Sequence, residues 1–322
     1  MSHQHYYQTL GQLLQVSDVE RRTVVCGAHT GSEALFQNGT LVASLGSATD
    51  GWDSDEVLRE QLSSPLEVVI FGGGHVGLEL AHLCVRLGLR HTIVDDRSEF
   101  CNRERFGEAT LLCLPFDEVF AQDRGWNRPI FIIVTRGHDH DRLCLEHCLA
   151  MNHRYLGMIG SRTKVAQTFA HLTDRGFSPS QLDTVHAPIG LKIGAVTASE
   201  IALSIMAEVV SSYRSGAQQV VRLDSALLAL QAHNRHIAVR VIGKSGSAPA
   251  EVGFTLALFE DGSTAGTIGG GVVEALAIEE AKWMASDGSI VDHTTHFDLS
   301  AGEAASIGMV CGGKIEVLFQ RR

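Results

Sequence analysis

One stretch of the sequence decides the fold: Val68-Val69-Ile70-Phe71-Gly72-Gly73-Gly74-His75-Val76-Gly77. The apolar residues 68–71 predict a buried parallel strand, and Gly72, Gly74 and Gly77 follow at the G-x-G-x-x-G spacing of a dinucleotide-binding turn. The first glycine of such a turn permits a sharp bend, the second lets a pyrophosphate approach the backbone, and the third lets the helix pack closely on the strand. Helix-forming sequence follows over 78–87, so we expect phosphate on free N–H groups at a helix N-terminus, beside His75.

A second predicted strand, 91–94, supports this interpretation because it ends in Asp95 and Asp96, about 23 residues beyond Gly72. A carboxylate at this place in a dinucleotide-binding unit binds a ribose hydroxyl. Asp95 is therefore a candidate nucleotide contact, with Arg97 beside it. The alternative is that Asp95 and Asp96 only cap the turn into Arg97.

Short apolar runs alternate with helical patterns as far as residue 212. This alternation predicts an α/β fold, with a Rossmann-like parallel sheet and helices on both faces. The predicted strands are 67–71, 91–94, 109–113, 130–134 and 155–159. The predicted helices are 76–87, 141–151, 162–175 and 198–212.

A polar linker over 213–219 separates this region from a smaller α+β domain. The domain is predicted to have helices at 224–233 and 272–286 and strands at 236–242, 253–259, 263–268, 289–297 and 314–319. The chain then has three parts: a β-rich N-terminal segment, 1–62; a nucleotide- or cofactor-binding domain, 63–215; and the α+β domain, 222–322.

The N-terminal segment partly repeats the α+β domain. The run Leu35-Phe36-Gln37-Asn38-Gly39-Thr40 matches Leu258-Phe259-Glu260-Asp261-Gly262-Ser263, and each run carries the two-residue turn signal of a β-hairpin. Two interpretations remain open. The hairpins are unrelated and share only turn chemistry, or residues 20–50 are a degenerate copy that packs beside the C-terminal domain.

Composition excludes several classes of protein. The formal charge of −11 argues against a general nucleic-acid or anionic-membrane surface. No apolar run reaches transmembrane length, and the start of the chain lacks a basic region followed by an apolar stretch. Seven cysteines without a C-x-x-C pattern fit a reducing cytoplasm better than a disulfide framework, so we expect a cytoplasmic protein.

Polar residues after strand 130–134 are further candidates, because ligands in open α/β sheets bind at the carboxyl ends of strands. Arg136 can pair with a phosphate through two hydrogen bonds, while His138 and Asp141 can orient one another. The structural alternatives are a loop hydrogen bond for His138 and a helix N-cap for Asp141.

The turn after strand 155–159 offers Ser161, Arg162 and Lys164, a hydroxyl and two cations at a predicted helix start. We expect them to contact an anion; the alternative is a solvated first helical turn. Elsewhere, Cys144 and Cys148 lie one helical turn apart, which would suit zinc, but their apolar surroundings favour ordinary core cysteines.

Several motifs taken together make the chain similar to a known family. In the Rossmann part they are 71–77, Val94-Asp95-Asp96-Arg97, Arg105-Phe106, Thr135-Arg136-Gly137-His138, Gly157-Met158-Ile159-Gly160-Ser161-Arg162 and Ala187-Pro188-Ile189-Gly190-Leu191. In the C-terminal part they are Gly246-Ser247-Ala248-Pro249, Gly266-Thr267-Ile268-Gly269-Gly270-Gly271 with Glu274, and Cys311-Gly312-Gly313. With these motifs the chain resembles the XdhC/CoxI family, accessory proteins that mature molybdenum hydroxylases such as xanthine dehydrogenase and aldehyde oxidoreductase.

The resemblance implies a maturation factor rather than an enzyme that turns over a small metabolite. Such a factor binds a molybdopterin-type molybdenum cofactor, with the cytosine dinucleotide form as one candidate. It assists sulfuration or protection of the cofactor and inserts it into an apo molybdenum hydroxylase. The implied partners are that client and a cysteine desulfurase, and we expect a homodimer. The Rossmann site would bind either the cofactor or a separate nucleotide such as NAD(P).

The resemblance also adds candidate residues in the C-terminal part. Gly269, Gly270 and Gly271, with Glu274 close by, form a second candidate anion cradle at a helix start; the alternative is that they are turn residues. Cys311 matches a family cysteine and is the candidate thiolate that carries sulfur or binds molybdenum. The alternative for Cys311 is an inert, buried cysteine.

The chain departs from the family pattern in two respects. The Rossmann domain precedes the glycine-triplet domain here, whereas the familiar order is the reverse. Val272 and Ala250 stand where the family usually has Cys and Arg. A thiolate ligand at position 272 is therefore absent.

Two other functions remain open from the residues alone. An NAD(P)-dependent oxidoreductase would explain Gly72 to Gly77 with Asp95, but it leaves Gly266 to Gly271 and Cys311 without a role. A nucleotide-sensing scaffold, in which the Rossmann site regulates docking, is the third hypothesis.

Overall fold

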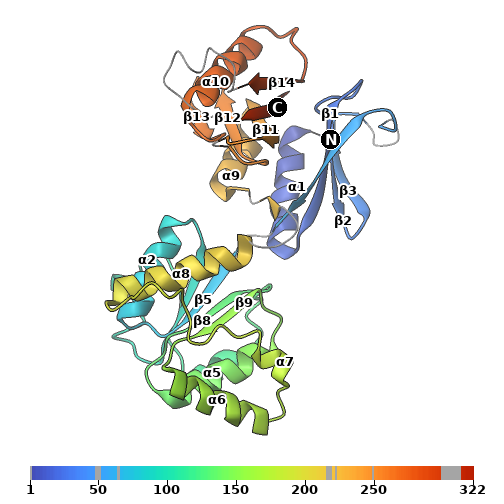
Figure 1. Ribbon diagram of the computed structural model, residues 1–322. Coiled ribbons are helices and arrows are strands. Elements are labelled where there is room, and N and C mark those ends of the chain that lie inside the picture. Colours follow the sequence, from blue (N-terminus) through green and yellow to red (C-terminus); the bar gives the residue numbers. More distant parts are fainter. Residues whose placement is uncertain are drawn as a thin grey trace. The chain divides into compact units, whose positions relative to one another are not determined.

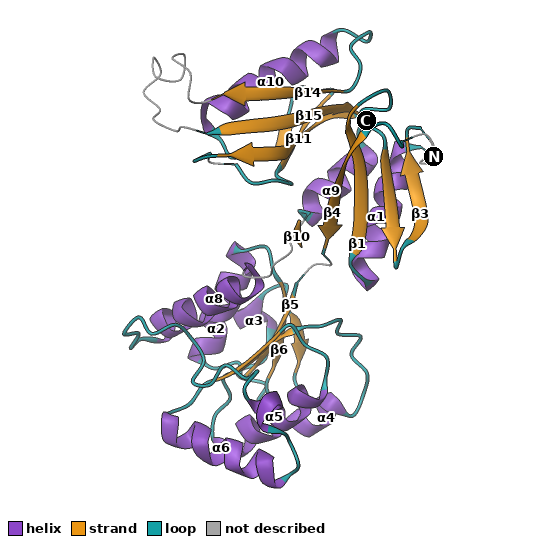
Figure 2. Ribbon diagram, turned by 45° about the vertical axis from the view of Figure 1, so that its right-hand side comes forward, coloured by secondary structure: helices purple, strands orange, loops and turns teal. Residues whose placement is uncertain are grey.

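The computed structural model describes residues 2–47, 52–63, 66–214, 220–221, 223–248, 250–298 and 313–322. The chain forms two compact units, each described here by itself. We call Leu66–Ala217 the Rossmann unit, and Met1–Pro65 together with Gln218–Arg322 the paired-sheet unit (Figures 1 and 2). None of the helices in the described ranges combines the length and apolar composition needed to cross a bilayer.

The Rossmann unit is built on a five-stranded parallel sheet in the order β7-β6-β5-β8-β9. Its strands are β5 (Glu67–Phe71), β6 (Arg90–Val94), β7 (Thr110–Leu112), β8 (Ile130–Ile133) and β9 (Tyr155–Met158). The strand order reverses direction at β5, and ligands of doubly wound folds bind at such a switch point. The loop after β5 is therefore where the fold itself predicts a binding site.

Helices cover both faces of this sheet (Figures 1 and 2). Apolar side chains of α2 and α8 pack on one face, and those of α5 and α6 pack on the other. The helices are α2 (His75–Arg86), α3 (Arg103–Phe106), α4 (Phe116–Phe120), α5 (His138–Ala150), α6 (Arg162–Asp174), α7 (Pro179–Leu182) and α8 (Ala198–Arg214). The predicted fold class is confirmed, although the three short helices were not predicted.

The paired-sheet unit contains two five-stranded sheets. The first, in the order β10-β4-β1-β2-β3, comprises β1 (Val19–Cys26), β2 (Glu33–Gln37), β3 (Thr40–Leu45), β4 (Glu56–Leu62) and β10 (Val220–Val221). The second, in the order β13-β12-β11-β15-β14, comprises β11 (His236–Ser245), β12 (Thr255–Phe259), β13 (Thr264–Gly266), β14 (His293–Asp298) and β15 (Lys314–Arg321). Three helices complete the unit: α1 (His3–Val16), α9 (Ser225–His233) and α10 (Gly271–Ser286).

The two sheets share one local topology. In each, a long strand (β1 or β11) is followed by a hairpin (β2–β3 or β12–β13), and a later strand (β4 or β15) pairs antiparallel on the other side of the long strand. Both long strands also carry a register shift against that later partner. The two hairpins that match in sequence thus occupy equivalent places, which favours the interpretation of a degenerate copy over that of unrelated hairpins.

Helix α1 packs against residues from both chain segments that make up the paired-sheet unit. Tyr6, Leu10 and Leu14 lie along one of its faces and are buried in the same core as Val221 and Leu228. The N-terminal segment, expected only to be β-rich, therefore begins with a helix that belongs to a shared core.

Candidate functional site

The glycine turn between β5 and α2 is held by packing at two of its glycines. Gly72 has a φ of 114° and donates its N–H to the carbonyl oxygen of Val94 at 2.8 Å. A Cβ at Gly72 would overlap the carbonyl oxygen of Val134, and one at Gly77 would overlap the carbonyl oxygen of Gly72. These two glycines therefore set the bend and the strand–helix distance, as the motif predicts.

Gly74 differs from its neighbours because no other atom lies within 4 Å of the place a Cβ would take. It is the N-cap of α2 and has no side chain to cap the helix. The amides of Gly74, His75 and Val76 donate no hydrogen bond to any residue that the structure describes. Free amides at the positive end of a helix dipole, with open space in front of them, suit a phosphate.

Asp95 lies beneath this turn rather than beside it. Its buried carboxylate accepts the Gly73 N–H at 2.8 Å, the backbone N–H of Arg97 at 3.1 Å, and two side-chain N–H groups of Arg97 at 2.8 Å each. Burial alone would raise the pKa of Asp95, but these hydrogen bonds outweigh burial and hold the pKa below its usual value. The carboxylate thus fixes the shape of the turn, and its role as a ribose contact stays a prediction.

Charged side chains surround the turn. Asp96 is partly exposed and lies 3.8 Å from both Arg97 and Arg136. Arg97 also stacks on the Phe100 ring at 3.8 Å, whereas Arg136 is 60% exposed. Arg105 donates to the carbonyl oxygen of Gly73 at 3.0 Å. Arg136 therefore has the freedom to reach a ligand phosphate, while Arg97 is anchored.

A second polar cluster lies at the carboxyl ends of β8 and β9. Thr135 follows β8 and donates its hydroxyl to Asp141 of α5 at 2.6 Å, and Lys164 of α6 donates to the other oxygen of Asp141. Asp141 is fully buried, and this burial raises its pKa in spite of the hydrogen bonds from Lys164 and Thr135. The cluster adjoins the glycine turn, because Thr135 is among the nearest neighbours of Gly72.

The position and the partners of Asp141 differ from those expected from the sequence. Asp141 lies within the first turn of α5 and is not its N-cap, which is Gly137. The side chain of His138 lies outside the described parts of the structure, so its pairing with Asp141 stays a prediction. Ser161 caps α6 by accepting the N–H of Lys164 at 3.2 Å, and the side chain of Arg162 is exposed beside it.

The second glycine loop, in the paired-sheet unit, already holds an anion of its own. The Glu274 carboxylate accepts the Thr267 hydroxyl, the Ile268 N–H at 2.9 Å and the Gly270 N–H at 3.2 Å. Burial alone would raise the pKa of Glu274, but these bonds lower it. A phosphate would have to displace Glu274 from these amides. The predicted roles of Gly269 and Gly271 in binding stay predictions.

The remaining predictions concern sulfur. Cys311 lies outside the described residues, so its role stays a prediction. Cys144 and Cys148 are fully buried in the core, and burial raises the pKa of both thiols well above the usual value. No group of three or more possible metal ligands occurs among the described side chains. The interpretation of the helical pair as core cysteines therefore agrees with the structure.

Sequence reasoning missed a buried ionic cluster between the two sheets of the paired-sheet unit. Arg21 donates to Glu60 at 2.9 Å, and Arg240 donates to Glu33 and to the Thr23 hydroxyl at 2.8 Å each. All four charged side chains are at most 5% exposed. The available signal was alternation, since Arg21 and Thr23 lie on the same side of β1 as the buried Val19 and Val25.

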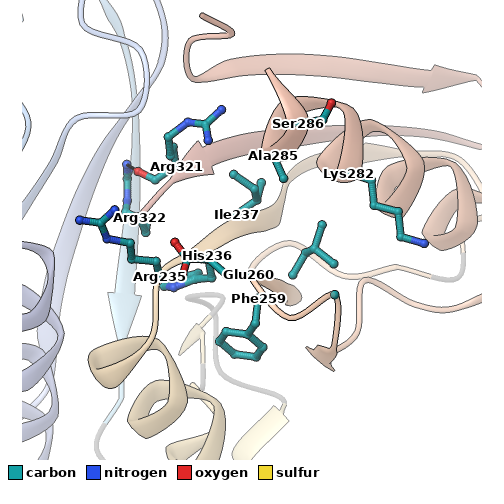
Figure 3. A pocket seen from close by; sticks show the side chains of 12 residues that line it. Arg235, His236, Ile237, Phe259, Glu260, Lys282, Ala285, Ser286, Arg321 and Arg322 are labelled. Atoms are coloured by element: carbon teal, nitrogen blue, oxygen red, sulfur yellow. Dashed lines mark hydrogen bonds between the residues drawn. The ribbon is translucent and has the colours of Figure 1, made fainter. Parts of the chain in front are cut away.

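The paired-sheet unit also contains a cavity of about 570 Å³ (Figure 3). Its apolar lining includes Ile237, Leu258 and Phe259, with Lys282 and Ala285 from α10. Arg321 lines it too, but its guanidinium donates to the carbonyl oxygens of Met284 and Asp287 at the end of α10. Arg321 thus serves to hold the end of the helix.

A parallel doubly wound sheet with free amides at its switch point defines a protein of the nucleotide- or cofactor-binding Rossmann class. Family comparisons narrow this class. The model described as the XdhC Rossmann domain matches residues 68–209, and the model of the XdhC and CoxI family matches residues 229–298. The chain belongs to the XdhC and CoxI family.

Two curated proteins match part of the chain. A Bacillus subtilis protein, named as a probable component of xanthine dehydrogenase, is 28% identical over 148 residues, which cover 45% of this chain and 42% of that protein. The Escherichia coli protein YqeB, described as uncharacterized, is 30% identical over 142 residues, which cover 44% of this chain and 26% of YqeB. The chain thus spans less than half the length of these two relatives.

A solved structure supports the fold. The Bacillus halodurans protein described as a xanthine dehydrogenase superposes with a TM-score of 0.55, covering 67% of this chain and 65% of that one. At 21% identity this likeness concerns the fold alone.

Proposed function

We propose that this chain is a maturation factor for a molybdenum hydroxylase. It binds a molybdopterin-type cofactor by its phosphate or pyrophosphate, assists sulfuration or protection of the cofactor, and inserts it into the apo client. The observation that carries the proposal is the start of α2, where three successive amides lack a partner among the described residues and Gly74 faces open space. Family membership supplies the kind of ligand, because the geometry alone indicates only a phosphate-bearing one.

The residues around the turn fit the phosphate end of such a cofactor. The amides from Gly74 to Val76 would hold the phosphate, and Arg136 would add positive charge beside it. Bound molybdenum supplies the redox chemistry of the client after insertion. This chain contributes binding and orientation, and the turn keeps its shape because Asp95 and Gly72 fix it from below.

Cys311 is the proposed sulfur carrier. Among the described cysteines, burial raises the pKa of Cys84 to about 12 and that of Cys101 to about 11, so neither is a ready thiolate. Cys26 and Cys113 are exposed. A persulfide passed from a cysteine desulfurase would need an accessible thiolate.

The test is client maturation by the full chain and its Cys311→Ser variant, with Cys113→Ser as the matched exposed control. We expect Cys311→Ser to fold normally and to lose client activation, while the control stays active. Maturation by Cys311→Ser at the wild-type rate would remove the thiol from the mechanism. Co-purified molybdenum and pterin fluorescence measure cofactor binding separately from sulfur transfer.

One observation favours a second function, an NAD(P)-dependent oxidoreductase. The Lys164–Asp141 pair adjoins the glycine turn and has the composition of an acid–base couple. Titrations with NADH and with the pterin cofactor separate the two functions. Tighter binding of the pterin cofactor supports maturation, and tighter binding of NADH supports the oxidoreductase.

A further inference from the structure

A further polar site lies inside the paired-sheet unit. It is a cavity of about 180 Å³ between α1, α9 and the two sheets. Polar side chains form much of its wall: Tyr7, Arg21, Gln231, Arg240 and Gln320. Each of these five residues is at most 6% exposed, so the wall belongs to the interior of the unit.

Several of these side chains have hydrogen-bonding capacity that the described residues leave unused. The amide of Gln231 and the hydroxyl of Tyr7 bond to no described residue. In the adjoining ionic cluster, Nη2 of Arg21 and Nε of Arg240 are buried without a hydrogen-bond partner in the described structure, and so are Oε2 of Glu33 and Oε1 of Glu60. Buried polar groups nearly always have partners, and an orphan in a folded protein calls for an explanation such as a bound ligand.

The charged residues near the cavity are not all part of its wall. Glu33 and Glu60 pair with the two arginines, but neither carboxylate is part of the cavity wall. Asp224 is part of the wall at the exposed end, and its carboxylate is engaged by the amides of Ala226 and Leu227 as the cap of α9. The unused groups of the cavity wall are the Gln231 amide and the Tyr7 hydroxyl, and the buried charged residues of the wall, Arg21 and Arg240, are cations.

We propose that this cavity binds a small oxoanion such as phosphate, sulfate or molybdate. Its volume equals roughly six water molecules at about 30 Å³ each, which admits one tetrahedral ion. Guanidinium groups bind oxoanions through charge-assisted hydrogen bonds, and the Gln231 amide and Tyr7 hydroxyl add neutral donors. The 570 Å³ cavity is a weaker candidate because two of its arginines are engaged elsewhere: Arg321 donates to carbonyl oxygens at the end of α10, and Arg322 pairs with Asp292.

The test measures binding of inorganic phosphate, sulfate and molybdate to the full chain by calorimetry and thermal shift. Gln231→Leu removes an amide that no described residue uses, so folding should be retained or improved. We expect this variant to raise the dissociation constant about tenfold, the effect of one lost hydrogen bond to a charged group. Tyr7→Phe should raise it about fivefold.

Tyr6→Phe is the matched control, because Tyr6 is also buried on α1 but does not line the cavity. It should bind each ion as the wild type does. The proposal is wrong if Gln231→Leu and Tyr7→Phe both keep wild-type dissociation constants, or if none of the three ions binds at millimolar concentration. An anomalous-scattering peak of soaked tungstate next to Gln231 would support it directly.

Cytidine monophosphate distinguishes a free ion from the phosphate end of a larger molecule. If the ester binds more tightly than phosphate and Gln231→Leu weakens that binding, the cavity binds a phosphate ester. If the ester does not bind in the cavity but phosphate does, the cavity binds a free ion. Binding of the ester that responds to Gly74 variants but not to Gln231→Leu belongs to the Rossmann turn. Different variants therefore test this cavity and the Rossmann turn, so loss of binding at one site leaves the other site unaffected.

Discussion

Gly74 permits a test in which charge alone decides the outcome. Asp and Asn are both among the best N-cap residues, and Gly74 is an N-cap with open space around its Cβ position. Either substitution should keep α2 stable or stabilise it by up to about 1 kcal/mol. The two variants have nearly the same shape, so they differ in the negative charge placed at the turn.

The expected magnitude follows from the position of that charge. A carboxylate at Gly74 lies about 4 Å from a phosphate on the neighbouring amides, and like charges at that distance repel by about 1 kcal/mol in water and about 4 kcal/mol at an effective dielectric constant of 20. The turn is half-buried, so we expect about 2 kcal/mol. Gly74→Asp should then bind a phosphate-bearing ligand about 30-fold more weakly than Gly74→Asn.

The assay is titration of both variants with the pterin cofactor and with NADH, at low and at high salt. The difference between the variants should shrink at high salt, because ions screen an exposed charge. Dissociation constants that agree within threefold would show that no phosphate binds at the start of α2. Gly77→Ala gives the contrasting result, since its Cβ would overlap the Gly72 carbonyl oxygen and should destabilise the fold itself.

Three further predictions concern stability. Glu274→Gln should destabilise the protein at pH 7. Because its hydrogen bonds lower the pKa of Glu274, the carboxylate stabilises the fold above its unfolded-state pKa of about 4.3, and this contribution is lost as the pH falls through the lower folded-state pKa. A destabilisation in urea melts that stays the same from pH 7 into strong acid would contradict this. Glu60→Gln leaves the buried Arg21 without its charge partner and should lower the free energy of unfolding by about 3 kcal/mol, and a loss under 1 kcal/mol in urea would refute it. Leu10→Ala in α1 should cost about 3 kcal/mol and shift the unfolding of the whole paired-sheet unit, whereas a locally frayed helix with an unchanged midpoint would show that α1 is peripheral.

The sequence allowed the Rossmann unit to be predicted almost element by element, because each buried strand there is a short apolar run between turn signals. Helix α1 was missed although Tyr6, Leu10 and Leu14 repeat at helical spacing and Ser2 caps the start. The hairpin match in the same segment indicates strands only. A helix in a segment that also contains strands is indicated only by its apolar repeat of 3.6 residues, a signal separate from the alternation typical of strands.

The roles of individual carboxylates could not be predicted from spacing. Asp95 and Glu274 both lie where a motif suggests ligand binding, yet both accept backbone amides of their own glycine turns. Whether an amide is free depends on a side chain's rotamer and depth, which a one-dimensional pattern does not contain. Arg21 and Arg240 were unpredictable for a related reason: their partners lie 39 and 207 residues away in the chain.

The paired-sheet unit is assembled from two stretches of chain with the Rossmann unit inserted between them. During synthesis, residues such as Tyr6 and Leu35 leave the ribosome long before Val221 and Leu228, which complete their core. The inserted unit has all of its strands in one continuous segment, so it can fold before the C-terminal segment that completes the paired-sheet core has been synthesised. A chain released early would therefore carry a finished nucleotide-binding fold together with an apolar surface that attracts chaperones.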